Sequence, residues 1–209
     1  MKDNRRSFLK KLGLTTGAAA LAPALMAEAN TIREEYLHRI KEDAADKPIR
    51  LALIGAGIMG TEDTNTALQH ANVSLVAVCD LYDGRLESAK KKWGDHLFLT
   101  KDHKEILKRA DVDAVIIGTP DSWHKQISVD ALNAGKHVYL EKTMTYDAEQ
   151  SLALVKLTQQ YPKQVLQVGH QYRYTPLYFK VKELIDKGYL GKVTQIDCRW
   201  DRNWNWRRP

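Results

Sequence analysis

A glycine-rich turn is the first group of residues whose types and spacing could do chemistry. Residues 55–60 read G-A-G-I-M-G, which matches the pattern G-x-G-x-x-G, and they follow an apolar run at residues 49–54. In this pattern the first glycine allows a tight turn, the second lets the backbone approach a diphosphate, and the third lets a helix pack close to a strand. A helix that opens here also presents unpaired N–H groups to phosphate oxygens. The turn therefore predicts a dinucleotide site formed by Gly55, Gly57, Ile58, Met59 and Gly60.

A carboxylate follows this turn at the sequence separation that is typical of dinucleotide-binding domains. Asp80 stands twenty residues after Gly60, at the end of a second apolar run at residues 73–79. A carboxylate in that place accepts hydrogen bonds from the adenosine ribose and repels a 2′-phosphate. Leu81 and Tyr82 come next and offer no basic group to hold such a phosphate. The sequence thus favours NAD over NADP, and the alternative is a plain strand–turn–helix in which Asp80 only caps a helix.

Three more groups of polar residues follow later apolar runs. They occupy residues 118–124 (G-T-P-D-S-W-H), 139–143 (Y-L-E-K-T) and 168–174 (V-G-H-Q-Y-R-Y). If the runs are parallel strands, all three groups lie at the carboxyl edge of the sheet, where such sheets bind ligands. Lys142 could there assist removal of a hydroxyl proton as a hydride leaves. The alternative for Lys142 is a solvated lysine at a strand end.

The elements that must position these residues alternate between short apolar runs and helical patterns. This alternation predicts an α/β fold, a Rossmann-type doubly wound parallel sheet, followed by the start of a second α/β domain. The expected strands cover residues 49–54, 73–79, 114–117, 137–140, 165–168 and 193–200. The expected helices cover residues 61–70, 83–93, 102–109, 123–134, 147–160 and 176–187.

In this order the motifs resemble those of the Gfo/Idh/MocA oxidoreductases, relatives of glucose–fructose oxidoreductase and inositol dehydrogenase. The resemblance runs from about Arg50 to the end of the chain and rests on four motifs. They are the glycine turn, T-P-x-x-x-H at 119–124, E-K-T at 141–143, and V-G-H-Q-Y-R at 168–173. Two positions depart from the family pattern. Thr143 replaces a proline, which could loosen the turn that holds Lys142, and Gln171 replaces an asparagine, which could alter the contact with the nicotinamide.

The resemblance implies a role for each matching residue. Lys142 would be the catalytic residue that faces both the nicotinamide and the sugar hydroxyl that becomes a ketone. Arg173 would contact the substrate. The remaining residues would line the cofactor: Thr119, Pro120, His124, Glu141 and Gln171. Without the resemblance, His124 is a partly buried packing residue. The family also uses an Asp and a His from a second domain, which would lie beyond Pro209.

The amino-terminal segment has the pattern of an export signal. Arg5 and Arg6 precede S-F-L-K, an apolar stretch follows at residues 12–27, and A-E-A closes it at 27–29. This order is typical of a secretory signal peptide, and the arginine pair resembles the twin-arginine type. Glycines and a proline interrupt the stretch, so we expect no stable membrane anchor. The alternative is a basic, amphipathic first helix.

Composition limits the other classes of function. The 209 residues carry a formal net charge of +6. Most of that excess lies in residues 1–12 and 199–209, so the body of the chain offers no basic surface for nucleic acid. Cys79 and Cys198 lack metal-ligand spacing, so we expect no metal site and a buried structural thiol at Cys79.

These observations lead to one hypothesis with two alternatives. The chain is expected to be part of an NAD-dependent oxidoreductase that acts on a secondary alcohol of a carbohydrate or polyol. It would be exported by the Tat machinery to the periplasm and would form a homo-oligomer at full length. The alternatives are an NAD-dependent glycosidase working by oxidation and elimination, and a non-catalytic NAD sensor.

The expected divisions of the chain are a signal peptide (1–29), a linker or helix (30–47), an NAD-binding domain (48–170) and the truncated beginning of a substrate domain (171–209). The tryptophan- and arginine-rich tail at 199–209 could be a sugar platform or an interface.

Overall fold

The computed structural model describes residues 48–199 and 201 of the chain. The expected signal peptide, the linker and most of the tryptophan-rich tail therefore lie outside the described residues. Contacts between residues divide the chain at Gln171, and the residues from Tyr172 onward belong to a separate unit. Each unit is described by itself.

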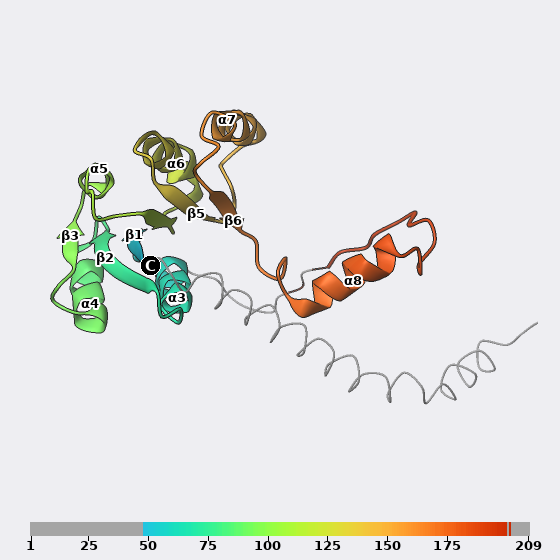
Figure 1. The fold of residues 1–209 in the computed structure, drawn as a ribbon, viewed down its shortest axis with the longest axis horizontal. Helices are drawn as coiled ribbons and strands as arrows, with labels where there is room; N and C mark the ends of the chain where they lie inside the picture. Colours follow the sequence, from blue (N-terminus) through green and yellow to red (C-terminus); the bar gives the residue numbers. More distant parts are fainter. Residues whose placement is uncertain (1–47, 200, 202–209) are drawn as a thin grey trace, which may run out of the picture. The chain divides into compact units, whose positions relative to one another are not determined.

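The first unit is built on one six-stranded sheet whose strands are all parallel (Figure 1). Its order is β3-β2-β1-β4-β5-β6. The strands are β1 (Ile49–Ile54), β2 (Val73–Cys79), β3 (Phe98–Thr100), β4 (Ala114–Ile117), β5 (His137–Glu141) and β6 (Leu166–Gly169). The chain winds outward from β1 in one direction and from β4 in the other. The sheet therefore has a topological switch point between β1 and β4, and ligands bind at the carboxyl ends of the strands there.

Helices cover both faces of this sheet. In Figure 1, α3 (Ile58–Ala67) and α4 (Asp83–Trp93) lie below the sheet, and α5 (His103–Leu107), α6 (His124–Asn133) and α7 (Ala148–Thr158) lie above it. A short 3₁₀ turn at Asp121–Trp123 leads into α6. This arrangement confirms the predicted Rossmann-type doubly wound sheet.

Alternate side chains of the strands form two apolar clusters, one on each face. Ala52 and Val115 point toward α5, α6 and α7, whereas Leu53 and Val78 point toward α3 and α4, and all four are fully buried. Cys79 belongs to the first cluster, and burial raises the pKa of its thiol to about 12. The prediction of a buried structural thiol is confirmed.

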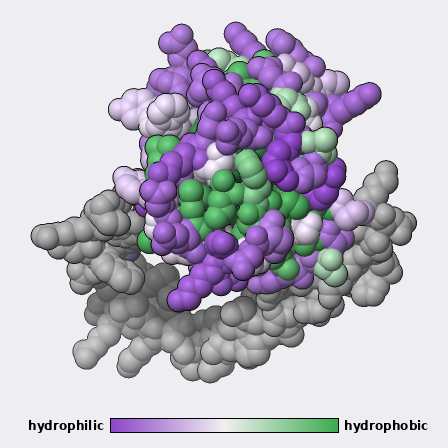
Figure 2. Space-filling view, turned by 90° about the vertical axis from the view of Figure 1, so that its left-hand side faces the viewer, coloured by the Kyte–Doolittle hydropathy of each residue, from purple (hydrophilic) through white to green (hydrophobic). Residues whose placement is uncertain are grey.

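The edge strand β3 is short and only partly covered. Phe98 and Leu99 are half-buried, and the guanidinium of Arg109 lies 4.6 Å from the centre of the Phe98 ring. Figure 2 views the molecule from the side on which Figure 1 labels β3, and it shows apolar surface surrounded by hydrophilic residues.

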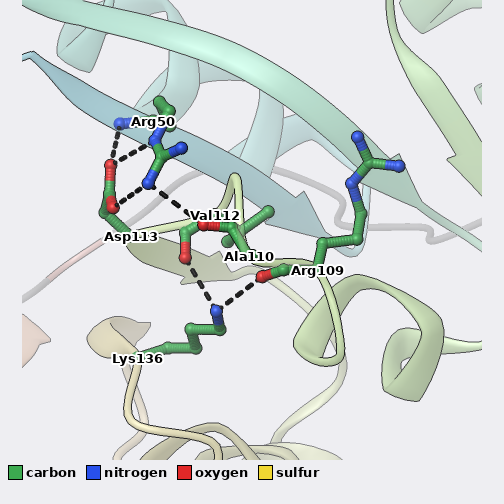
Figure 3. A network of polar contacts seen from close by, with 6 residues as sticks. All are labelled: Arg50, Arg109, Ala110, Val112, Asp113 and Lys136. Atoms are coloured by element: carbon green, nitrogen blue, oxygen red, sulfur yellow. Dashed lines mark hydrogen bonds and ion pairs between the residues drawn. The ribbon is translucent and has the colours of Figure 1, made fainter.

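A polar network joins the amino ends of β1, β4 and β5, at the edge opposite the ligand-binding edge (Figure 3). The guanidinium of Arg50 donates to both oxygens of Asp113 at 2.9 and 2.7 Å, and the Arg50 backbone N–H donates to Asp113 at 2.8 Å. Lys136 is buried, and its ammonium donates to the carbonyls of Arg109 and Val112 at 2.7 and 2.8 Å. The network holds three strand ends together without using any predicted site residue.

The structure corrects three details of the sequence prediction. Residues 193–199 are not a strand, because a strand requires a hydrogen-bonded neighbour and no described segment pairs with them. Strand β3 was not placed from sequence, since three residues are too short to show a pattern. Helix α3 begins at Ile58 rather than at residue 61, directly after the glycine turn.

The second unit contains one described helix, α8 (Pro176–Asp186). Proline stands in its first turn, where no N–H is needed, and Gly188 follows its end with φ of +72°. The predicted helix at 176–187 is confirmed. No helix in the described ranges is both long and apolar enough to cross a membrane.

Candidate functional site

The glycine turn packs tightly against the loop after β4. Gly55 has φ of +93°, and a Cβ on it would lie 2.7 Å from the backbone N of Thr119. A Cβ on Gly60 would lie 2.2 Å from the carbonyl oxygen of Gly55. Both positions therefore require glycine, and together they bring the start of α3 against the switch point of the sheet.

Gly57 serves a different purpose, because nothing fills the space beside it. A Cβ there would meet only the tip of the Arg85 guanidinium, at 3.9 Å, among the atoms of the described residues. Gly57 is the N-cap of α3 and makes no side-chain capping bond, so the first N–H groups of the helix, those of Ile58, Met59 and Gly60, have no intrahelical partner. An open cradle with unpaired donors at a helix N-terminus fits a diphosphate.

Asp80 is buried beside this turn. Its carboxylate accepts hydrogen bonds from the backbone N–H of Ala56 at 2.8 Å and from that of Tyr82 at 3.0 Å. The residue thus ties the glycine turn to the end of β2, and its Oδ1 atom, which accepts only from Tyr82 among the described residues, keeps a lone pair that a ribose hydroxyl could use.

Arg85 is a residue of this site that the sequence analysis missed. It lies in the first turn of α4, and its guanidinium is 3.4 Å from Asp80 and 4.9 Å from the centre of the Tyr82 ring. The expectation that no basic group lies near Asp80 considered only the two residues that follow it. Arg85 stands five residues after Asp80, in the first turn of the helix that follows β2, and this short separation in sequence is the signal that could have pointed to it.

His124 is almost completely buried, with 1% of its surface exposed. One ring nitrogen lies 2.8 Å from the carbonyl oxygen of Thr119, and the other lies 2.6 Å from that of Thr143. The ring therefore connects the loop after β4 to the loop after β5, and both of its nitrogens are occupied by backbone. This arrangement matches the packing role considered for His124 without the family resemblance.

Thr119 and Pro120 lie next to this connection. The side-chain oxygen of Thr119 is buried and has no hydrogen-bond partner among the described residues. Pro120 is exposed and opens the 3₁₀ turn. A buried hydroxyl without a partner beside the glycine turn is a group that a bound dinucleotide could satisfy.

Lys142 follows β5 and is exposed at the carboxyl edge of the sheet. The peptide bond between Lys142 and Thr143 is cis. Two contacts hold this turn: His124 bonds the Thr143 carbonyl, and the buried Thr145 bonds the Asp147 carbonyl at 2.8 Å. The structure therefore gives the turn firm support although threonine replaces the family's proline.

A pair of carboxyl groups, the half-buried Asp63 and the buried Glu141, lies beside Lys142. Asp63 of α3 and Glu141 of β5 are hydrogen-bonded to each other, and the second oxygen of Asp63 is buried with no partner among the described residues. Burial, together with the negative charge of Glu141, raises the pKa of Asp63 to about 7. Burial also raises the pKa of Glu141, against the opposing effect of Lys142 and His124. Two carboxyl groups in such contact share one proton.

Gly169 makes room for this pair. A Cβ on Gly169 would lie 2.8 Å from a carboxylate oxygen of Glu141 and 2.5 Å from the hydroxyl of Tyr139. The glycine of the V-G-H-Q motif is therefore explained by the side chains of the neighbouring strand.

Two predicted residues fall at or beyond the end of the first unit. Gln171 is its last residue and is exposed. Arg173 is also exposed, but it belongs to the unit that begins at Tyr172 and is described apart from the site. In the described part of the chain, no group of His, Cys, Asp or Glu could hold a metal ion.

A doubly wound parallel sheet with a glycine turn at its switch point defines a dinucleotide-binding Rossmann domain. The chain belongs to the Gfo/Idh/MocA oxidoreductase family with an NAD-binding Rossmann fold, whose model matches residues 49–170. The predicted family and the predicted NAD-binding fold are both confirmed.

Similar proteins of this family include several inositol dehydrogenases. The inositol 2-dehydrogenase of Rhodococcus erythropolis is 34% identical over 155 residues, which cover 73% of this chain and 44% of that protein. An inositol 2-dehydrogenase/D-chiro-inositol 3-dehydrogenase of Lactiplantibacillus plantarum is 28% identical and matches 77% of this chain.

A solved structure of an inositol dehydrogenase is also similar to this chain. The scyllo-inositol dehydrogenase of Lactobacillus casei, solved with bound NAD(H) and scyllo-inositol, superposes with a TM-score of 0.66 at 32% identity over 71% of this chain and 44% of the solved chain. The chain thus spans a little less than half the length of the relatives that it matches.

Proposed function

We propose that the chain supplies the cofactor site and the proton-accepting lysine of an oxidoreductase that oxidises a secondary alcohol of a polyol or carbohydrate. One observation carries this proposal. Lys142 is exposed at the same sheet edge as the glycine turn, directly after the buried Glu141. The similarity to inositol dehydrogenases supports a cyclic polyol as the class of substrate.

Each residue of the site has a physical task in this reaction. The N–H groups at the start of α3 bind the diphosphate, and Asp80 accepts hydrogen bonds from the adenosine ribose. Bound NAD supplies the acceptor for the hydride. The Lys142 amine takes the proton of the substrate hydroxyl, so that proton and hydride leave the same carbon–oxygen unit together.

The carboxyl pair of Asp63 and Glu141 sets the charge beside Lys142. With one shared proton the pair carries a single negative charge directly beside Lys142. His124 holds the loop after β5 in place, so the lysine side chain starts from a fixed backbone.

A binding and turnover experiment on the full-length protein tests the proposal. We expect NAD to bind to the 209-residue chain in calorimetry, and NADH to accumulate when full-length protein is incubated with NAD and inositol isomers. Lys142→Met retains binding and loses turnover by more than a hundredfold, the usual range for general acid–base groups. Cleavage of an aryl glycoside without NADH would instead support the glycosidase, and binding without any turnover would support the sensor.

We also propose that the protein is exported by the twin-arginine route to the periplasm. The proposal rests on Arg5 and Arg6 followed by S-F-L-K, and on the small residues at 27–29. A reporter fused after residue 47 is expected to reach the periplasm, and the double change Arg5→Lys with Arg6→Lys is expected to keep it inside. A matched change of Lys10→Arg with Lys11→Arg also conserves charge and leaves the arginine pair intact. Equal export of the two variants would contradict this route.

A further inference from the structure

Arg85 occupies a place between two parts of the cofactor site. Its guanidinium lies 3.4 Å from a carboxylate oxygen of Asp80, at the position expected for the ribose. The same guanidinium lies 3.9 Å from the point where a Cβ of Gly57 would stand. Since the bare backbone of Gly57 marks the approach of the diphosphate, the guanidinium borders the space for the phosphates.

The contact between Arg85 and Asp80 leaves most of the guanidinium free to bind something else. A single Nη1 atom contacts Asp80 at 3.4 Å, and the Arg85 side chain is 44% exposed. The pair of Arg50 and Asp113 shows the contrast, because there two nitrogens donate to two oxygens at 2.9 and 2.7 Å. A guanidinium has five N–H donors, so Arg85 can contact Asp80 and still donate to another acceptor.

Asp80 does not depend on Arg85 for its place in the structure. Its two oxygens already accept hydrogen bonds from the backbone N–H groups of Ala56 and Tyr82, at 2.8 and 3.0 Å. The Arg85 guanidinium lies over the Tyr82 ring, 4.9 Å from the ring centre, an arrangement that attracts a cation without using its N–H donors. Arg85 is therefore held near the site by a ring and a carboxylate, and only its Nη1 atom contacts Asp80.

We propose that Arg85 is a phosphate-binding side chain of the cofactor site, which donates to the diphosphate of the dinucleotide. Charge supports this assignment, because the described start of α3 offers only backbone N–H groups and a diphosphate carries two negative charges. A planar guanidinium suits phosphate oxygens better than an ammonium does. The 2′-phosphate of NADP would present the same chemistry beside Asp80, so the experiment has to separate these two phosphates.

Calorimetric titration of the 209-residue chain with NAD, ADP-ribose, NADP and adenosine makes that separation. We expect Arg85→Ala to weaken binding of NAD and ADP-ribose about tenfold, in line with loss of one charge-assisted hydrogen bond, and to leave adenosine binding unchanged. Arg85→Lys recovers only part of the loss. Lys92→Ala is the matched control, since Lys92 is a cation over the Trp93 ring of the same helix, and we expect it to bind like the unchanged chain.

The other outcomes are equally informative. A loss confined to NADP assigns Arg85 to the 2′-phosphate and keeps it as a phosphate-binding residue. Unchanged affinity for every phosphate-bearing ligand, or an equal loss for adenosine, would overturn the proposal and leave Arg85 as a partner of Asp80 or of the base. This inference rests on the cofactor site of the proposed function. Absence of NAD binding in the unchanged chain would reject that function, whereas normal binding in Arg85→Ala rejects only the role of Arg85.

Discussion

The carboxyl groups of Asp63 and Glu141 are hydrogen-bonded to each other across the space between α3 and β5. A hydrogen bond between two carboxyl groups requires a proton on one of them, and the pKa of Asp63 is accordingly raised to about 7, by burial first and then by Glu141. Glu141 directly precedes Lys142 in the chain. The pair therefore places a titrating group within the site near neutral pH.

This pair gives the stability of the chain a specific dependence on pH. The pKa of Asp63 rises from 3.8 to about 7 on folding, so the folded state holds a proton that the unfolded state has lost. Its contribution is fully present below about pH 4 and disappears as the pH rises through 7. We expect Asp63→Asn to melt several degrees above the unchanged chain at pH 8, and the difference to shrink toward pH 5.

Thermal unfolding at pH 5, 6, 7 and 8 measures this effect. Asp95→Asn is the control, because Asp95 is an exposed carboxylate outside the pair. If Asp63→Asn and Asp95→Asn follow the same pH profile, the two carboxyls do not share a proton.

The His124 ring connects the loop after β4 to the loop after β5, and a substitution of His124 should remove this connection. His124→Ala leaves the Thr119 and Thr143 carbonyls without their partner, and we expect a loss of about 1–3 kcal/mol in the free energy of unfolding. In full-length protein we expect kcat to fall more than KM rises, because Lys142 loses its support while the cofactor turn is intact.

His103→Ala is the matched control for His124. His103 also begins a helix, but its ring is bonded to the Asp130 carboxylate at 2.9 Å rather than to the carbonyl of the loop after β5. A comparable fall in kcat in both variants would mean that His124 acts only through overall stability.

A side chain larger than that of Gly169 should clash with the neighbouring strand, next to the carboxyl pair of Asp63 and Glu141. Gly169→Ala would place a Cβ 2.5 Å from the Tyr139 hydroxyl and 2.8 Å from Glu141, and we expect a loss of about 1–3 kcal/mol in the free energy of unfolding. Adding Tyr139→Phe removes the nearer atom and is expected to restore part of the loss in urea unfolding. Gly84→Ala is the control, since its Cβ would meet nothing within 4 Å. No rescue by Tyr139→Phe would contradict this steric account.

The Arg50–Asp113 contact at the amino ends of the strands should make the folding stability of the chain sensitive to acid. The hydrogen bonds from Arg50 lower the pKa of Asp113 to about 2. The stability from this depressed pKa is present above about pH 4 and is lost as the pH falls toward 2. We expect Asp113→Asn to lower the melting temperature by a few degrees at pH 7 and by less at pH 3. NAD affinity is expected to stay unchanged at pH 7, and a large change would show that this edge influences the site.

Local patterns made much of this fold predictable from sequence. The glycine turn, Asp80 and the alternating strands and helices depend on neighbouring residues, so the sequence alone located them. The strand predicted at 193–200 is absent over the described residues 193–199, because apolar alternation indicates a strand but cannot supply its partner. The contact between Asp63 and Glu141 could not be predicted, since α3 and β5 meet only after the sheet has formed. Arg85 was overlooked for a simpler reason: only Leu81 and Tyr82 were examined after Asp80, whereas Arg85 lies in the first turn of the helix that follows.

The shared proton also alters the electrical charge of the molecule. The formal count of +6 at pH 7 treats every carboxyl as ionised, so a proton held between Asp63 and Glu141 makes the folded chain one unit more positive on the acid side of neutrality. Asp63→Asn therefore raises the formal count but leaves electrophoretic mobility in a native gel nearly unchanged at pH 6. At pH 8 the same variant migrates as the more cationic species.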